Sequence, residues 1–327
     1  MTATLKSIAQ DARVAMSTVS YILSGTGRHK FSEETCRKVL ESAERLNYRP
    51  NLKARALCKG RTYVVGALFR SLTYSFVPNI IEGFEHVMES NGFCLMLATY
   101  TPDNFTRKCN YLYQHGVEGV AILPSPDITV PDLGDLERDG IPVISIADSL
   151  GNRPKVMVAN EETGSLPMNY LADHGHTVVA YAGVDEARRR GITKALDRHR
   201  HTHCHFMQQQ CHPLPDVRET FAWLKSLSPF PTAVICDSDT YAIALIQCAT
   251  QDGLRIPEDL SVMGIDGMDI GNYSLPPLTT VAQQTYEHGI KAGELLLDAI
   301  NGKEVRDCIM QPTIIERQSC RTLHPAN

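Results

Sequence analysis

The 327-residue sequence has no uninterrupted apolar run near the length that crosses a bilayer. Its ten cysteines are scattered without a CxxC spacing, which is typical of reduced, packed thiols rather than of a disulfide scaffold. The opening residues, MTATLKSIAQ, do not form a basic-then-apolar leader. We therefore expect a globular protein of the cytoplasm with no membrane-spanning segment.

The motifs of common enzyme classes are also missing. The sequence contains no GxGxxG after a first strand, no GxxxxGK[ST], no HExxH and no GxSxG. Asp239 and Asp266 are the carboxylate pair that a catalytic interpretation would need, and that interpretation is the alternative to a binding protein. We predict that the protein is not an enzyme and uses no cofactor.

The net charge of −5 conceals a strong difference along the chain. Residues 1–61 carry twelve Lys and Arg against five Asp and Glu, whereas the remaining residues carry 20 against 32. The basic segment has the charge to bind a polyanion, and the acidic remainder does not. Any nucleic-acid contact is therefore expected from the N-terminal segment.

Three short amphipathic helices are predicted within the first 49 residues. The first begins after Thr4 as N-cap and the third after Ser32, each followed by apolar residues at helical spacing. The second helix, in VAMSTVSYIL, has an apolar side and a side rich in hydroxyls. A four-residue break between the first two helices is typical of a helix-turn-helix module, although a helical bundle with a polar surface also fits this pattern.

The hydroxyl-rich side of the second helix is the predicted DNA-reading surface, because short side chains let a helix approach base edges in the major groove. Met16 suits contact with thymine methyl groups. The loop that follows is rich in candidates for phosphate contacts, which position a protein on DNA without reading its sequence. The candidate DNA-binding residues in this module are Thr4, Met16, Ser17, Thr18, Ser20, Tyr21, Arg28 and His29.

Another short helix is predicted between residues 50 and 61. Pro50 disfavours helix at the residue before it, Asn51 is a candidate N-cap, and Gly60 ends the helix. A helix of about two turns is marginal in water. This segment therefore needs a surface to fold against.

Beyond residue 61, apolar runs alternate with amphipathic segments, which predicts strands alternating with helices. The strand pattern starts at residues 63–68 and restarts at residues 156–158. This rhythm predicts two doubly wound α/β lobes with parallel sheets.

The run TLKSIAQDARVAMSTVSYILSG, followed by FSEETCRKVLESAERLNYRPNLKARALCKGRT, resembles the N-terminal domain and hinge of the lactose/galactose repressor family of bacterial transcription regulators. GHTVVAYAG, GLRIPEDLSVMGIDGMD and LPPLTTVAQQ match the same family in the right order. The resemblance covers nearly the whole chain. It implies a small all-α helix-turn-helix domain at 1–49, a hinge helix and linker at 50–61, and a two-lobed, periplasmic-binding-protein-like α/β domain at 62–327.

The resemblance also implies how these parts work. The N-lobe would comprise residues 62–155 and 284–311, and the C-lobe residues 156–283 and 312–327. In the family, hinge helices of two subunits enter the minor groove, where a paired leucine wedges between base steps. The residues implied for that contact are Asn51, Ala54 and Leu57, and the alternative for Leu57 is packing on the core domain.

An effector site between the lobes is implied as well. Arg188 stands three residues before Gly191, where the family has an effector-binding arginine, and its planar fork suits paired hydroxyls or a carboxylate. The full set of candidate effector residues is Arg70, Phe76, Arg188, Asp239, Asp266, Tyr273 and Gln283. This set favours a sugar or sugar derivative, and leaves a purine or an acid open.

Three positions depart from the family pattern, which usually has Gly at Arg13, Ser at Ala15 and Arg at Tyr21. Arg13 implies a strained turn, and Ala15 lacks a side-chain N-cap worth ~1 kcal/mol. We predict a homodimeric repressor that binds a palindromic operator under the control of a small polar effector, with a higher oligomer left open. The alternative is a ligand sensor whose DNA-binding module has lost operator binding.

A histidine-rich segment, residues 199–212, raises the question of a metal. On a strand, His201, His203 and His205 would share one face and hold zinc with a further ligand. A surface loop that runs into a strand explains the segment equally, and no ligand pair has finger-like spacing. We therefore predict no metal site.

Overall fold

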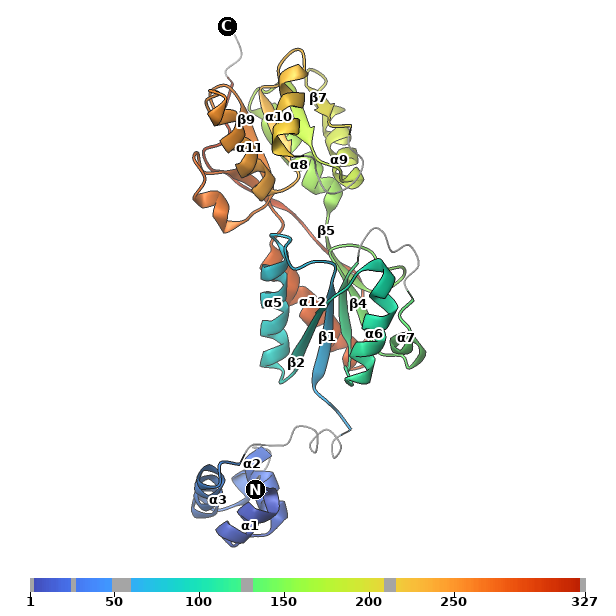
Figure 1. The fold of residues 1–327 in the computed structure, drawn as a ribbon, viewed down its shortest axis with the longest axis vertical. Coiled ribbons are helices and arrows are strands. Elements are labelled where there is room, and N and C mark those ends of the chain that lie inside the picture. Colours follow the sequence, from blue (N-terminus) through green and yellow to red (C-terminus); the bar gives the residue numbers. More distant parts are fainter. Residues whose placement is uncertain (1–2, 25–27, 49–59, 125–131, 209–215, 324–327) are drawn as a thin grey trace. The chain divides into compact units, whose positions relative to one another are not determined.

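The computed structural model describes residues 3–24, 28–48, 60–124, 132–208 and 216–323, and the chain forms two compact units, Met1–Thr62 and Tyr63–Asn327 (Figure 1). Asn51, Ala54 and Leu57, which the family resemblance assigns to the minor groove, lie outside the described residues. None of the described helices is long and apolar enough to span a membrane.

The first unit is a three-helix module made of α1 (Leu5–Ala12), α2 (Met16–Ser24) and α3 (Glu33–Arg45), with a short 3-10 turn at Arg28–Lys30. Thr4 and Ser32 are the N-caps of α1 and α3, as predicted: their side chains accept hydrogen bonds from the N–H groups of Ser7 and Thr35. The three helices enclose a small core whose fully or nearly fully buried members are Ile8, Ala9, Val19, Ile22 and Val39.

A polar contact fastens α1 to α3 beside this core. The Asp11 carboxylate accepts hydrogen bonds from the Ser42 hydroxyl and the Arg45 guanidinium. These bonds hold the pKa of Asp11 below its ordinary value. The contact therefore fixes how the first helix lies against the third, and α2 is held between them.

The turn between α1 and α2 carries backbone strain at Arg13. Its φ of 57° and ψ of 45° lie in the left-handed region, where the Cβ of any residue other than glycine is crowded. The turn is held by the N–H groups of Arg13 and Val14, which both donate to the Ala9 carbonyl. Strain of this kind costs about 1–3 kcal/mol and persists only where surrounding contacts hold it.

Arg13→Gly should therefore stabilise the first unit by about 1 kcal/mol, since glycine adopts this conformation freely but has more entropy to lose on folding. Hydrogen exchange of the buried α1–α3 amides in the full chain measures this gain. Arg13→Ala is the matched control, because it removes the side chain and keeps the Cβ. Equal protection in both variants would mean that the backbone conformation is not the source of strain.

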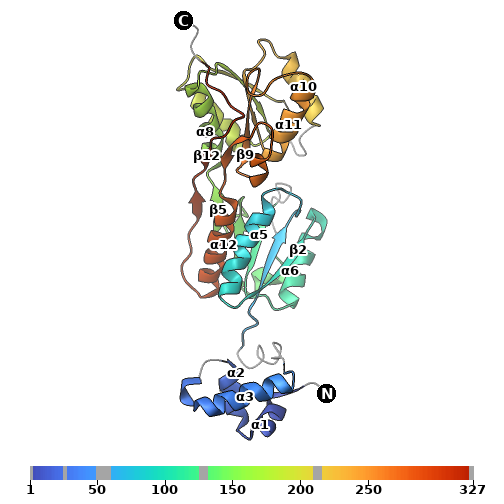
Figure 2. The same ribbon diagram turned by 90° about the vertical axis from the view of Figure 1, so that its left-hand side faces the viewer.

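The second unit contains two sheets, confirming the predicted two-sheet α/β architecture (Figures 1 and 2). The first sheet is entirely parallel, in the order β11-β5-β4-β3-β1-β2. Its strands are β1 (Val64–Phe69), β2 (Cys94–Thr99), β3 (Val120–Leu123), β4 (Val143–Ile146), β5 (Lys155–Val158) and β11 (Cys308–Met310). We call this sheet and its helices the first lobe.

Helices cover both faces of the first sheet. One face packs on α5 (Val77–Ser90) and α12 (Thr285–Ile300), and the other on α6 (Phe105–Gln114) and the short α7 (Asp135–Arg138). A 3-10 turn at Pro102–Asn104 precedes α6. Helices α5 and α12 lie side by side although about 200 residues separate them (Figure 2). The first lobe is therefore built from both halves of the chain.

The second sheet repeats the same strand order and defines the second lobe. Its order is β12-β10-β9-β8-β6-β7, with only β12 antiparallel to its neighbour among the described strands. The strands are β6 (Val178–Ala182), β7 (His203–Phe206), β8 (Ala233–Cys236), β9 (Ser261–Asp266), β10 (Thr279–Ala282) and β12 (Thr313–Ile315). In a doubly wound sheet of this order, ligands bind at the carboxyl ends of the strands.

Four helices enclose the second sheet. One face packs on α8 (Asn160–Asp173) and α9 (Glu186–Leu196), and the other on α10 (Val217–Ser226) and α11 (Asp239–Gln251). A 3-10 turn at Asp269–Asn272 follows β9. Both sheets are thus covered on two sides, which explains why their central strands, such as β3, β4 and β8, are buried and nearly continuous apolar runs.

The chain passes between the lobes three times, and one predicted boundary is wrong. The predicted C-lobe begins at residue 156, but β5 pairs with β4 and β11 in the first sheet, so the first crossing follows Val158. The later crossings fall between β10 and α12 and between β11 and β12. A three- or four-residue strand carries too little pattern to reveal which sheet it joins.

Candidate functional site

Helix α2 presents two chemically opposite faces, as its sequence predicts. Val19 and Ile22 are fully buried, whereas Met16 and Tyr21 are 56% and 50% exposed. Ser17 and Ser20 are exposed as well, and Thr18 is half-buried. The exposed face therefore combines two large side chains with short hydroxyls, a surface that fits base edges in a major groove.

Basic and polar groups flank this face. The ammonium of Lys30 lies 5.8 Å from the centre of the Tyr21 ring. Thr4 and His29 are exposed, and the backbone of Arg28 belongs to the 3-10 turn. Lys30 thus places a cation of the kind that contacts phosphates beside the exposed face of α2.

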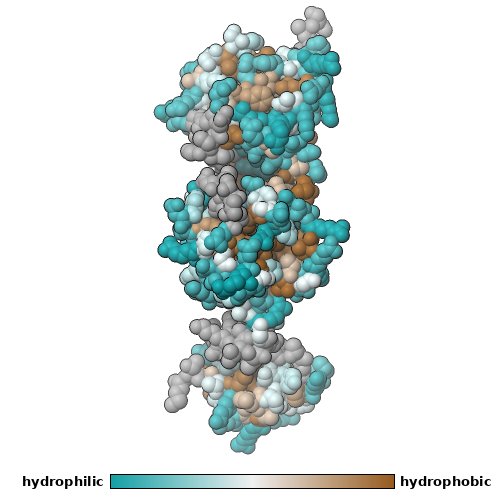
Figure 3. Space-filling view, turned by 90° about the vertical axis from the view of Figure 1, so that its right-hand side faces the viewer, coloured by the Kyte–Doolittle hydropathy of each residue, from teal (hydrophilic) through white to brown (hydrophobic). Residues whose placement is uncertain are grey.

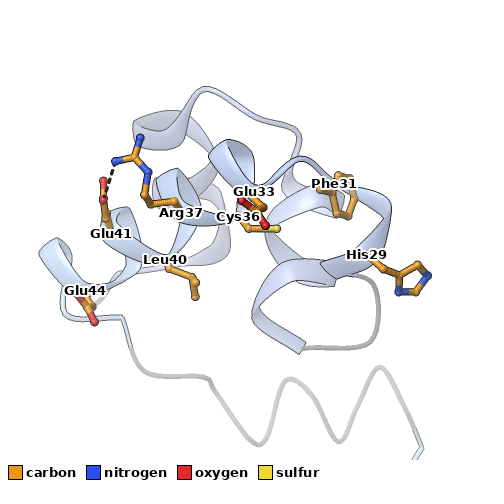
Figure 4. Close-up of a pocket in the computed structure, with 8 residues that line it drawn as sticks. All are labelled: His29, Phe31, Glu33, Cys36, Arg37, Leu40, Glu41 and Glu44. Atoms are coloured by element: carbon orange, nitrogen blue, oxygen red, sulfur yellow. Dashed lines mark hydrogen bonds and ion pairs between the residues drawn. The ribbon is translucent and has the colours of Figure 1, made fainter.

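A shallow groove along α3 has a different character (Figure 4). His29, Phe31, Cys36 and Leu40 line it together with Arg37 and three glutamates, Glu33, Glu41 and Glu44. Arg37 pairs with Glu41 at 3.1 Å, so its charge is compensated within the groove. The acidic lining does not suit phosphate, and we do not assign the groove to DNA.

In the second unit, most of the candidate effector residues follow the carboxyl ends of strands. Arg70 comes directly after β1, Asp266 ends β9, and Gln283 follows β10. Arg188 lies in the first turns of α9, the helix that follows β6. Parallel strands bring these ends to one edge of each sheet, where polar side chains gather around bound ligands.

Arg188 is held in a buried ion pair that the sequence did not reveal. One of its Nη atoms (Nη1) lies 2.7 Å from Oδ1 of Asp237, and the two side chains are only 12% and 4% exposed. The same oxygen accepts a 2.6 Å hydrogen bond from the Tyr181 hydroxyl, and Oδ2 accepts one from the Val184 N–H. Although burial opposes ionisation, the Arg188 charge and these hydrogen bonds keep the pKa of Asp237 below its ordinary value.

The backbone at Arg188 is fixed by close helix packing. A Cβ on Gly164 of α8 would lie 2.0 Å from the Arg188 carbonyl oxygen, so only glycine permits this approach of α8 to α9. The Asp185 side chain caps α9 by accepting from the Arg188 N–H. Arg188 is thereby positioned by residues on both helices.

Asp266 connects the two lobes. Its Oδ2 accepts a hydrogen bond of 3.2 Å from the Ser75 hydroxyl of the first lobe, and its Oδ1 one of 2.8 Å from the Gln283 amide at a crossing. Burial raises the pKa of Asp266 to about 7, against the opposing influence of the Arg188 charge. Its φ of 135° is a strained backbone conformation, such as functional sites often retain.

Asp266→Asn should stabilise the protein more at pH 8 than at pH 5, by a difference of about 1–3 kcal/mol. The pKa of Asp266 is higher in the folded protein than in the unfolded chain. The stability that its protonated side chain contributes is therefore lost as pH rises through 7, because the wild-type protein must then bury a negative charge. Urea unfolding at both pH values measures the difference. Asp269→Asn, at an exposed position three residues later, is the control. Equal gains at both pH values would contradict the raised pKa.

Other predicted effector residues lie in different surroundings. Asp239 is fully buried, and its carboxylate accepts hydrogen bonds from the Thr280 hydroxyl and the Met268 N–H. Phe76 stacks on Tyr74 with ring centres 5.9 Å apart. Tyr273, in contrast, is 81% exposed. Asp239 thus acts within the second lobe, and Tyr273 faces outward in this structure.

Four residues of the candidate ligand site, Ser75, Tyr74, Tyr181 and Asp237, were not predicted. Asp237 directly follows β8, so its place at a strand end was a signal that the sequence did contain. Tyr181 lies inside β6 and is fully buried, which makes it indistinguishable by pattern from a core aromatic. The ion pair depends on two segments that only the folded sheet brings together.

Four residues of the histidine-rich segment, His203–Phe206, form the edge strand β7. The rings of His203 and His205 are 4.5 Å apart, while His201 precedes the strand. Within the described ranges, no three His, Cys, Asp or Glu side chains are arranged to hold a metal. Cys211 and His212 lie outside these ranges.

Comparisons with known proteins match both units. Residues 4–51 match the model for bacterial regulatory proteins of the lacI family, and residues 168–320 match that for a periplasmic binding protein-like domain. The HTH-type transcriptional repressor PurR of Vibrio cholerae is 32% identical over 98% of this chain and 99% of its own length.

Solved structures show the same fold. The lac repressor dimer bound to operator and the anti-inducer ONPF superposes with a TM-score of 0.79 at 21% identity, covering 98% of this chain and all of that one. A LacI family transcriptional regulator from Enterococcus faecium with bound ribose gives 0.69 at 26% identity, covering 80% of this chain and all of that one. From its full-length similarity and matching fold, we conclude that the chain belongs to the lacI family of bacterial regulatory proteins.

Proposed function

We propose that the protein is a cytoplasmic, non-enzymatic repressor that binds a palindromic operator and responds to a small polar ligand in its second unit. The exposed face of α2 carries this proposal, because Met16, Tyr21 and the serines stand on a helix whose opposite side is buried. The relative from Vibrio cholerae, similar over its whole length, is a repressor.

A sugar or sugar derivative is the proposed ligand class. Arg188 and Gln283 supply donors and Asp266 an acceptor, a combination that fits hydroxyl groups. The similar regulator from Enterococcus faecium was solved with ribose. We propose that Asp266, which contacts Ser75 across the lobes, couples ligand binding to the arrangement of the lobes.

We also propose that the active form is a homodimer. Large apolar side chains remain exposed on the second unit: Leu97 on β2, Ile270, Tyr273 and Leu275 are 38%, 52%, 81% and 86% exposed. Apolar patches are visible on each lobe in Figure 3. The lac repressor in the similar structure is a dimer. Tyr273 is then better explained by contact with a second copy than by contact with the ligand.

Selection of bound duplexes from a random pool by the full-length protein tests the function. Enrichment of a palindrome would support a two-fold DNA reader. If well-folded protein enriches no sequence at any salt concentration, the helix-turn-helix module has lost operator binding, and the strained turn at Arg13 and the missing side-chain N-cap at Ala15 explain the loss. The protein would then be a ligand sensor.

Met16→Ala and Tyr21→Ala should each relax base preference at one position per half-site, with a loss of about 1–3 kcal/mol for the preferred operator. Selection repeated with each variant, followed by binding titration, measures both effects. Tyr111→Ala removes a tyrosine of similar exposure, 48%, from the second unit and serves as control. An unchanged preferred sequence in both α2 variants would remove this face from base reading.

A further inference from the structure

The surroundings of Arg188 determine which ligand charge the site accepts. Its Nη1 donates both to Oδ1 of Asp237 at 2.7 Å and to the Asp237 carbonyl at 2.9 Å. Asp237 is in turn fixed by Tyr181 and by the Val184 N–H, so the pair is anchored in the second lobe. The positive charge of Arg188 is therefore already compensated inside the protein.

The wider charge balance points the same way. Asp237, Asp239 and Asp266 are 7%, 0% and 4% exposed; Asp237 follows β8, Asp239 begins α11, and Asp266 ends β9. Only Asp237 is held ionised by its surroundings, because burial raises the pKa of Asp239 and of Asp266. An anionic ligand would therefore meet a guanidinium whose charge the Asp237 carboxylate already balances. An anion beside this pair would bring its negative charge close to the Asp237 carboxylate without solvent between them, and such like charges repel strongly.

The hydrogen-bonding groups that remain available in the candidate ligand site suit hydroxyl groups of a ligand. Nε of Arg188 is buried and has no hydrogen-bond partner among the described residues, so it is a donor available for an oxygen atom. Asp266 offers carboxyl oxygens next to the Gln283 amide and the Ser75 hydroxyl. A hydroxyl accepts from one such group and donates to another, which a carboxylate or phosphate oxygen cannot do.

We propose that Asp237 is a specificity residue, which makes the site select uncharged, hydroxyl-rich ligands and reject carboxylated or phosphorylated ones by neutralising Arg188. This inference rests on the proposed ligand site and narrows its ligand class. It assigns to Asp237 a role in choosing the ligand in addition to its role in packing.

Thermal unfolding of the full chain, titrated with glucuronate and with inorganic phosphate at constant ionic strength, tests the proposal. Three proteins are compared: wild type, Asp237→Asn and Asp237→Asn/Arg188→Gln. We expect Asp237→Asn to gain a saturable stabilisation by at least one anion, with an affinity about tenfold or more above wild type. The double variant should lose this gain, which separates Arg188 from the basic residues of the first unit.

Two results would overturn the proposal: anion binding by wild type as tight as by Asp237→Asn, or no gain in Asp237→Asn. Asparagine keeps an oxygen for the Tyr181 hydroxyl, and Asp237→Ser replaces it if the asparagine variant fails to fold. Binding of the selected operator by the same proteins is measured without ligand. If Asp237→Asn binds operator but gains no anion affinity, the result contradicts this inference alone and does not contradict the proposed repressor function.

Discussion

Arg188→Ala is expected to lower the free energy of unfolding of the second unit by about 3–5 kcal/mol and to abolish the response to ligand. The stability loss follows because Asp237, with a side chain 4% exposed, would remain buried without its cation. The ligand response is lost because the site would no longer contain its guanidinium. Urea unfolding and the ligand-dependent change in operator affinity measure the two effects separately.

Two further variants identify the source of this instability. Arg188→Ala/Asp237→Asn should recover most of the lost stability and none of the ligand response, since it removes the unpaired charge and leaves the site without its arginine. Arg190→Ala is the control, because Arg190 is 59% exposed and forms a surface pair with Glu161 worth at most about 1 kcal/mol. If Arg188→Ala and Arg190→Ala lower the free energy of unfolding by the same amount, the buried Arg188–Asp237 pair is not a major contributor to stability.

Operator affinity is expected to fall about a thousandfold between 50 and 200 mM salt. The excess of basic residues lies in residues 1–61, and cations released from the phosphates on binding make association depend steeply on salt concentration. Equilibrium titration with the selected operator at several salt concentrations gives the slope of the logarithm of affinity against the logarithm of salt concentration. A flat dependence would contradict anchoring by the basic N-terminal unit.

Single lysines test where the phosphate contacts lie. Lys30→Ala should reduce the slope by about one, because Lys30 stands beside Tyr21 on the DNA-reading side. Lys38→Ala should change it little, since the Lys38 ammonium is paired with Glu34 at 2.7 Å on α3. Equal changes from the two variants would mean that the side of the unit that faces DNA is wrongly assigned.

Local patterns in the sequence were sufficient for much of the fold. The caps at Thr4 and Ser32 and the two faces of α2 follow from residues within one or two turns of each other. The apolar runs at residues 63–68 and 156–158 match β1 and β5 to within one residue, because such runs are visible without knowledge of their partners. The place of β5 was missed, since it depends on pairing with β11, some 150 residues away.

The candidate ligand site was only partly predictable. Arg188, Asp266 and Gln283 were predicted through family resemblance, and the structure brings polar partners to Arg188 and Asp266. Asp237 was missed although it stands at a strand end, because its pairing with Arg188, 49 positions away, cannot be read from the local sequence. Asp239 was predicted to face the ligand, but its oxygens are engaged by Thr280 and Met268, which only the packing of β9 and β10 could reveal.

The interleaving of the two lobes has a consequence for synthesis on the ribosome. The core of the first lobe needs Ala292 and Leu296 of α12, and its sheet needs β11, so this lobe stays open until almost the whole chain has been made. The helices α1 to α3 need only neighbouring residues and form first. Each nascent chain therefore carries a folded DNA-reading module while its ligand-binding unit is still incomplete. During this time the apolar strands of both lobes are exposed to chaperones.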